Sequence, residues 1–154
     1  MPESKIYTTL NYSPNFDVKK RAVKEIKFII FHYTGMKKEN QAITQLTNTK
    51  SKVSSHYLIK NNGEILTLVP DLYVAWHAGI SSWKNYKSIN KYSIGIEISN
   101  PGHEYSYKKF SKKQIKSILK LSTYLRKKYK IKSNFILGHS DISPDRKIDP
   151  GPKF

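Results

Sequence analysis

The chain has 154 residues, of which 38% are hydrophobic and 12% aromatic, with seven Gly and seven Pro. This composition fits one globular domain with its own core and excludes a low-complexity chain. The absence of Cys excludes disulfides and leaves His, Asp and Glu as side-chain ligands for any metal site. No apolar segment approaches the ~18 residues that cross a bilayer, and the N-terminus lacks a signal-peptide pattern. We therefore expect no transmembrane segment and a soluble protein, and the compartment stays open.

Basic residues outnumber acidic ones by 28 to 11, which gives a net charge of +17 at neutral pH. A charge of this sign attracts anionic polymers, nucleic acids among them. Only three of the basic residues are Arg, however, and nucleic-acid readout leans on the Arg fork. The Lys residues are scattered and densest on one predicted helix, where they fit a solvated face. We expect no specific nucleic-acid partner.

The chain begins with an irregular N-terminal arm, predicted over residues 1–25, which contains Pro2 and Pro14. The run IKFIIFHYTG at 26–35 is nearly all apolar up to His32, which is typical of a strand covered on both faces. In the next segment, KENQAITQLTNTK, apolar residues recur at helical spacing and predict a short amphipathic helix.

The middle of the chain combines a hairpin, a loop and a strand. In SSHYLIKNNGEILTLV, two apolar-rich runs around the NNG turn predict a β-hairpin. Residues 71–92, with WHAG and SSWKNYKS, show no sustained period and predict a long ordered loop, a kind of segment that often has a function. In YSIGIEISN the three Ile residues share one face of a predicted strand, and Gly95 and Glu97 lie on the other, where Gly95 leaves room beside the carboxylate.

A helix is predicted from the capping box of Ser111 and Gln114 through about Tyr129. Its predicted apolar face consists of Ile115, Ile118, Leu119, Ser122 and Leu125. The run NFILGH then predicts a last short buried strand that ends at His139, and the tail from Ser140 is predicted as a loop.

Two of the five His residues, His32 and His139, end apolar strands. Strand ends and the loops that leave them form the concave sites of sheet folds, so these residues could meet although they lie far apart in the sequence. Asp149 could supply a third ligand, since Pro150 holds the residue before it in extended geometry. Taken singly, a His at a strand end is more often structural, and an Asp before Pro is most often a turn residue. The residue patterns alone therefore indicate only a candidate zinc site at one edge of the sheet.

Five segments in order, FIIFHYTG, VSSHYLIKNNGEILTLVP, WHAG, SIGIEISN and ILGHSDISPDRKIDPGPKF, resemble the type 2 class of zinc-dependent N-acetylmuramoyl-L-alanine amidases. This class also contains phage amidases and peptidoglycan recognition proteins, and the IGIE and RKxDPGP patterns are most similar to its AmpD and AmiD members. The segments cover most of residues 26–154. The resemblance implies an α/β (α+β) fold, in which this single catalytic domain has a central mixed β-sheet flanked by helices and follows the arm at 1–25.

The resemblance also implies, position by position, what the site residues do. His32, His139 and Asp149 match the ligands of one zinc ion per chain. Glu97 matches the acid/base carboxylate and Lys147 a second catalytic residue.

A further three residues, Trp76, His77 and Asn100, match positions that line the substrate groove of the family, although for the first two a packed loop explains the pattern nearly as well. The implied substrate is peptidoglycan or a muropeptide, in cell-wall turnover or recycling. The implied reaction is hydrolysis of the amide between the lactyl group of N-acetylmuramic acid, in its ordinary or 1,6-anhydro form, and L-Ala. The alternative is a module that binds peptidoglycan without cutting it. We expect a monomer.

One position departs from the family pattern. Phage-type members and animal recognition proteins place a catalytic Tyr directly before the His of the second strand, where this chain has Ser55 before His56. Glu97 is then the only general base that the resemblance supplies, and we interpret His56 as structural. The chain also stops at Phe154, directly after the ligand loop, which leaves open whether a further C-terminal region belongs to the protein.

Overall fold

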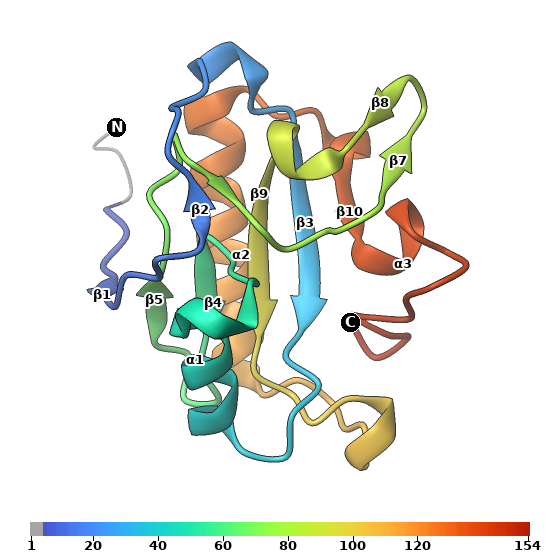
Figure 1. Ribbon diagram of the computed structural model, residues 1–154. Helices are drawn as coiled ribbons and strands as arrows, with labels where there is room; N and C mark the ends of the chain where they lie inside the picture. Colours follow the sequence, from blue (N-terminus) through green and yellow to red (C-terminus); the bar gives the residue numbers. More distant parts are fainter. Residues whose placement is uncertain (1–4) are drawn as a thin grey trace.

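The computed structural model describes residues 5–154, so the first four residues of the predicted arm, Pro2 among them, lie outside the described part. Its centre is a six-stranded sheet with the strand order β1-β5-β4-β9-β3-β10 (Figure 1). The strands in chain order are β1 (Thr9–Leu10), β3 (Phe28–Tyr33), β4 (Tyr57–Ile59), β5 (Ile65–Thr67), β9 (Ser93–Ile98) and β10 (Ile136–Gly138). β4 and β5 form the predicted hairpin and are antiparallel, whereas the other neighbours are parallel. The predicted mixed sheet is confirmed.

Strands β3 and β9 are interior strands of the sheet, because their apolar residues can be covered on both faces. On β9, Ile94, Ile96 and Ile98 are fully buried in the main core, as their alternation predicts. Glu97 lies on the opposite face, and the parallel register places it directly beside His32 of β3. The sheet itself therefore brings together two polar side chains that are far apart in the sequence.

Helix α2 (Lys112–Tyr129) covers one face of the sheet, behind it in Figure 1. The predicted capping box is present, since the Ser111 hydroxyl accepts from the backbone N–H of Gln114 and the Gln114 side chain accepts from the backbone N–H of Ser111. The helix buries Gln114, Ile118, Leu121 and Leu125.

The predicted apolar face of α2 is wrong at Ile115 and Leu119, which are 46% and 63% exposed. At 3.6 residues per turn, both lie roughly a quarter-turn or more from the middle of the buried face. Gln114 takes a buried position because its side-chain amide donates to the carbonyl of Ser99 at 2.7 Å. Gln114 and Leu121, neither of which belongs to the predicted face, thus lie with Ile118 and Leu125 on the buried face of the helix.

The opposite face of the sheet carries the candidate site and is covered by several short elements rather than by one long helix. Helix α1 (Glu39–Thr47), at the predicted position, buries Leu46 against a Leu cluster on β4 and β5. A second cluster joins Phe28 and Ile30 of β3 to the segment that follows β6 (Val74–Ala75) and to α3 (His139–Ile142). His32 and Glu97 share this face with the two clusters.

Three segments that were predicted as irregular contain short elements. The arm holds β1, β2 (Phe16–Asp17) and a 3-10 turn at Val23–Glu25, and the loop at 71–92 holds β6, β7 (Ser82–Trp83), β8 (Tyr86–Lys87) and a 3-10 turn at Ile89–Tyr92. These two strands of the arm pair with distant partners, β1 with β5 and β2 with β6, and no local pattern reveals such pairing. The tail begins with the short helix α3 rather than a loop, and β10 is a half-buried edge strand rather than a buried one.

The arm is also held by a buried side chain. Arg21 is only 8% exposed, and its guanidinium donates to the backbone carbonyls of Asp71, Asn90 and Lys91. These bonds tie the arm to both ends of the loop at 71–92. Within residues 5–154, no helix combines the length and apolar character that crossing a membrane requires.

Candidate functional site

Three predicted site residues, His32, His139 and Asp149, converge at one edge of the sheet. β3, β9 and β10 are parallel, so their carboxyl ends meet at the same edge. His32 lies at the end of β3, and His139 directly follows β10, the neighbouring strand. The loop after α3 returns Asp149 to the same place, where its carbonyl accepts from the backbone N–H of Ser140 at 2.9 Å.

The donor atoms of these residues form a small triangle. His32 Nδ1 lies 3.0 Å from His139 Nδ1, and both nitrogens lie 3.3 Å from Oδ2 of Asp149. Ligands ~2.0–2.1 Å from a tetrahedral zinc ion would be about 3.3 Å apart, so the triangle has the size that such an ion requires. All three side chains are buried, and they form the one His/Cys/Asp/Glu group within residues 5–154 that could hold a metal.

The ring of His139 is fixed with one nitrogen toward the triangle. Its Nε2 lies 3.0 Å from the carbonyl oxygen of Ala78, which can only accept a hydrogen bond, so Nε2 carries the proton and Nδ1 presents a lone pair. Burial lowers the pKa of His32 below its ordinary value, which keeps this imidazole neutral and able to ligate. Two imidazoles and a carboxylate therefore fit a divalent cation with nitrogen and oxygen ligands.

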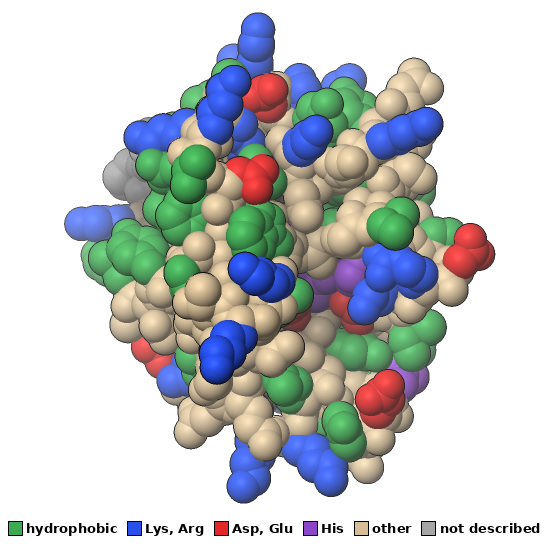
Figure 2. All heavy atoms as spheres, viewed as in Figure 1, with side chains coloured by type: hydrophobic (Ala, Val, Ile, Leu, Met, Phe, Trp, Pro, Cys, Tyr) green, Lys and Arg blue, Asp and Glu red, His purple; other side chains and the backbone are tan. Residues whose placement is uncertain are grey.

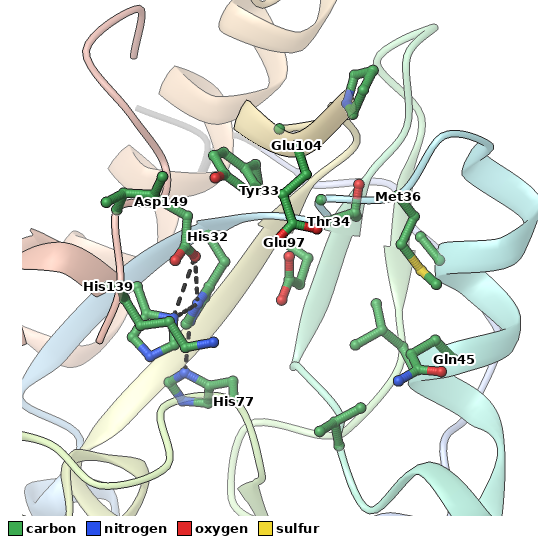
Figure 3. Close-up of a pocket in the computed structure, with 18 of the residues that line it drawn as sticks. His32, Tyr33, Thr34, Met36, Gln45, His77, Glu97, Glu104, His139 and Asp149 are labelled. Atoms are coloured by element: carbon green, nitrogen blue, oxygen red, sulfur yellow. Dashed lines mark hydrogen bonds and ion pairs between the residues drawn. The ribbon is translucent and has the colours of Figure 1, made fainter. Parts of the chain in front are cut away.

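Glu97 points into the same space from β9 (Figure 3). Its Oε2 atom is inaccessible to solvent and has no hydrogen-bond partner within the described residues. Burial raises the pKa of Glu97 well above its ordinary value, and the negative charge of Asp149 adds to the effect, while the Lys147 ammonium acts against it. An unpartnered carboxylate with a raised pKa is suited to accept and return a proton.

The loop that carries Asp149 is held by an aromatic cluster of Tyr33, His103 and Tyr107. The Tyr107 hydroxyl donates to the carbonyl of Pro150 at 2.9 Å, and the His103 ring stacks on Tyr107 with centroids 4.4 Å apart. The Tyr33 hydroxyl lies 2.9 Å from Nδ1 of His103. The Asp149–Pro150 peptide bond, which these contacts adjoin, is cis. The ligand loop is thus supported by residues outside it, from β3 and from the segment before α2.

A cavity of about 520 Å³ opens over the candidate metal centre. Figure 2 shows it as a hollow on this face, with His and acidic side chains at its floor. Besides the proposed ligands and Glu97, the predicted residues Lys147 and Trp76 line it. The indole N–H of Trp76 donates to the Asp17 carboxylate at 2.8 Å, which anchors this wall to β2 of the arm.

The other two predicted groove residues lie differently. Asn100 is 2% exposed and is absent from the cavity lining. Its side-chain amide donates to the carbonyl of Lys108 and its side-chain oxygen accepts from the N–H of Gly102, so it organises the turn after β9. His77 touches the cavity, but both of its ring nitrogens have protein partners, His32 and Ser93.

His56 lies beneath the site and behaves as the predicted structural residue. Its Nδ1 accepts from the backbone N–H of Gly95 at 3.0 Å, and its Nε2 lies 2.8 Å from the carbonyl of Tyr73. Burial lowers the pKa of His56 to about 4, and the positive charge of Arg21 contributes in the same direction. The neighbouring Ser55 is fully buried and donates to the carbonyl of Tyr57.

Several cavity residues were not predicted from the sequence. Met36 and Gln45 form the wall opposite the metal centre, and Glu104 also lines the cavity (Figure 3). Arg146 lines the cavity and donates to the carbonyls of Ala78 and Ile80. Their placement depends on α1 and on the long loops, so only the three-dimensional structure reveals them.

Comparison with known proteins gives one consistent result. Residues 22–152 match the family described as N-acetylmuramoyl-L-alanine amidase. The chain is 38% identical over 145 residues to the N-acetylmuramoyl-L-alanine amidase AmiD of Escherichia coli K12, with 86% of the chain and 51% of AmiD covered. It is 32% identical over 160 residues to the 1,6-anhydro-N-acetylmuramyl-L-alanine amidase AmpD of Haemophilus influenzae, with 92% of the chain and 84% of AmpD covered.

A solved structure shares the fold. The complex of E. coli AmiD with the substrate anhydro-N-acetylmuramic acid-L-Ala-D-gamma-Glu-L-Lys matches with a TM-score of 0.78 and 37% identity, over 84% of this chain and 54% of that one. The chain thus spans about half the length of AmiD.

Proposed function

Because the chain belongs to the N-acetylmuramoyl-L-alanine amidase family, we propose that it hydrolyses the amide between the lactyl group of N-acetylmuramic acid and L-Ala of a peptidoglycan stem. The observation that carries the proposal is the placement of Glu97 beside the triangle of His32, His139 and Asp149. A proton-accepting carboxylate next to three metal donors and an open cavity is the arrangement that metal-assisted amide hydrolysis requires.

The proposed substrate is a muropeptide, in its 1,6-anhydro form. This choice follows the names of two relatives: AmpD is named for the 1,6-anhydro substrate, and the AmiD complex contains an anhydro-muramyl tripeptide. A hollow about 520 Å³ in volume gives room for a sugar and the first residues of a stem peptide at the metal centre.

Zinc is the metal that we propose for the site, one ion per chain, held by His32, His139 and Asp149. When bound, zinc acts as a Lewis acid that polarises the scissile carbonyl and makes water a better nucleophile at neutral pH. The protein contributes rigid donors for this purpose. His32 lies on β3 and His139 directly follows the parallel neighbour β10, while Asp149 lies on a loop held at Ser140 and Pro150.

Glu97 is the proposed proton carrier. Its carboxylate, which lines the cavity, takes a proton from the attacking water as the new C–O bond forms. The same carboxyl then gives the proton to the nitrogen of L-Ala as the C–N bond breaks, so that the leaving group departs as a neutral amine. The raised pKa of Glu97 makes it a stronger base than an exposed Glu and favours the first of these transfers.

Lys147 and Trp76 complete the proposed site. Lys147 precedes Asp149 by two residues and lines the cavity, so its ammonium is placed to stabilise the negative oxygen that develops on the carbonyl carbon. Trp76 forms a cavity wall and offers an apolar ring face to the substrate. Asn100 takes no part in the proposed substrate contacts, because its side-chain groups are engaged within the turn.

The experiment that tests the function compares defined muropeptides, anhydro and non-anhydro, incubated with the zinc-loaded protein and with protein treated with a chelator. Mass spectrometry should find free stem peptide only with the loaded protein and more of it from the anhydro substrate. The matched variant is Glu97→Gln, which should keep its zinc by elemental analysis and release no peptide. Zinc-loaded wild-type protein that binds the muropeptide and leaves it intact would instead establish the peptidoglycan-binding alternative.

A further inference from the structure

The ring of His77 lies between a proposed metal ligand and the protein interior. Its Nδ1 is 2.9 Å from Nε2 of His32, and its Nε2 is 3.0 Å from the hydroxyl of Ser93 (Figure 3 marks the first contact). The Ser93 hydroxyl is in turn 2.8 Å from the backbone carbonyl of Ile89. His32, His77 and Ser93 are all buried, so no solvent competes for these bonds.

The direction of this chain of hydrogen bonds follows from its last member. The Ile89 carbonyl can only accept, so the single hydroxyl proton of Ser93 points to it, and the Ser93 oxygen must accept from Nε2–H of His77. A neutral His77 with its proton on Nε2 has a bare Nδ1. That nitrogen accepts from Nε2–H of His32, which leaves Nδ1 of His32 without a proton.

The bare Nδ1 of His32 is the atom that faces His139 and Asp149. We propose that His77 is a positioning residue, which holds the His32 ring in the tautomer and orientation that metal binding needs and does not act by contacting substrate. The inference rests on the proposed metal site but not on which amide is cleaved. Loss of the hydrogen-bond partner on the other ring nitrogen of a ligating His typically weakens metal affinity 10–100-fold.

Gly95 provides the space that the His77 ring occupies. A Cβ added at Gly95 would lie 2.4 Å from Cγ of His77 and 2.6 Å from its Nδ1, so the imidazole lies directly on the α-carbon of this glycine. The room that Gly95 leaves next to Glu97 on β9 is therefore filled by His77. Any larger residue at 95 must push the ring off His32, although position 95 itself touches no metal donor.

The segment that follows β6 orients both imidazole ligands. His77 acts on His32 through its side chain, and the next residue, Ala78, acts on His139 through its backbone carbonyl. The Asn90 side chain fixes this pair of residues by accepting from both of their backbone N–H groups, at 3.2 and 2.8 Å. One short stretch of the loop thus orients the rings of two proposed ligands, one on β3 and one directly after β10.

Zinc affinity, measured by competition with a chromogenic chelator, tests the proposal without any substrate. His77→Leu fills a similar volume without a ring nitrogen, and we expect it to weaken zinc binding 10- to 100-fold. His77→Asn keeps an acceptor oxygen near the position of Nδ1 and should stay within about threefold of wild type. Gly95→Ala should weaken binding as His77→Leu does. Ile80→Ser, a change in the same loop at a side chain that is 86% exposed, is the control and should leave zinc affinity unchanged.

Nitrogen NMR of the imidazoles gives a second readout, in both zinc-loaded and metal-free wild-type protein. The expected spectrum shows the proton of His32 and of His77 on Nε2 in each case. Ser93→Ala removes the acceptor that fixes His77 and should restore a mixture of tautomers in the metal-free form. Zinc binding by His77→Leu as tight as wild type, or a His32 proton on Nδ1, overturns the proposal. A wild-type protein that binds no zinc sinks the proposed function, while the spectrum of the metal-free protein still decides the role of His77.

Discussion

Acidification should destabilise this protein through His56, and the size of the effect follows from its surroundings. The pKa of His56 is lowered from 6.5 to about 4 by burial and by the nearby Arg21, whereas in the unfolded chain it stays near 6.5. At pH values between these two pKa values, His56 binds a proton in the unfolded state but not in the folded state. The free energy of unfolding therefore falls as pH falls from 6.5 to about 4, and this contribution is fully present only above pH 6.5.

Each pH unit of this gap corresponds to about 1.4 kcal/mol, so His56 accounts for about 3 kcal/mol in total. The matched variant is His56→Asn, whose side-chain oxygen can still accept from the N–H of Gly95 but does not titrate. It will be less stable than wild type at neutral pH, because the bond to the Tyr73 carbonyl is lost. The informative quantity is the difference between the two proteins as a function of pH.

The assay is urea denaturation followed by tryptophan fluorescence between pH 7.5 and 4.5, with chelator present so that metal release does not contribute. The gap in stability between wild type and His56→Asn should shrink by about 2 to 3 kcal/mol over this range. The other buried His residues are common to both proteins, so most of their contribution cancels. Parallel pH curves for the two proteins would refute the reasoning, because they would mean that His56 takes up its proton equally easily in the folded and unfolded states.

Three further predictions concern the helix and the cavity. Leu121→Ala should lower the free energy of unfolding by about 2 to 5 kcal/mol in urea denaturation, since this side chain is fully buried. Leu119→Ala, at an exposed position, should lower it by less than about 0.5 kcal/mol, and equal effects would mean that α2 presents a different face to the sheet. Lys147→Met should reduce kcat about 10²- to 10³-fold in the muropeptide assay with zinc content unchanged, and a change confined to KM would argue against oxyanion stabilisation. Trp76→Ala should raise KM with little change in kcat, and an unaltered KM would remove this ring from the substrate site.

The elements that could be predicted from the sequence are those whose signal is local. The alternation of Ile94, Ile96 and Ile98 fixed β9 and the direction of Glu97, and the pair Ser111 and Gln114 located the start of α2. The short strands β1, β2 and β6 pair with partners more than 50 residues away, so periodicity does not reveal them. Strands β7 and β8 pair with each other but have only two residues each, too few to show a period. The buried face of α2 was mispredicted because it includes Gln114, whose buried hydrogen bond to the Ser99 carbonyl no helical pattern indicates.

The site residues likewise divide into those with a local sequence signal and those that depend on distant partners. Residue patterns placed His32, His139 and Asp149 only as a candidate metal set, and the resemblance to a family assigned their roles, which the geometry now supports with donor atoms 3.0–3.3 Å apart. The arrangement of His77 could not be anticipated, because a His in a loop motif looks the same whether it faces a substrate or a ligand. Its partners, His32 and Ser93, come from two neighbouring strands and become visible only when these pair.

The attachment of the arm has a practical consequence for anyone who shortens this protein. The match to the family begins at residue 22, yet β1 closes one edge of the main sheet and β2 pairs with β6 before that point. A version trimmed to the match would leave the backbone of β5 open along one side, which invites strands of other molecules to add and the protein to aggregate. It would also remove Asp17, the anchor of the Trp76 wall. Samples for crystallisation or spectroscopy should therefore begin before Thr9.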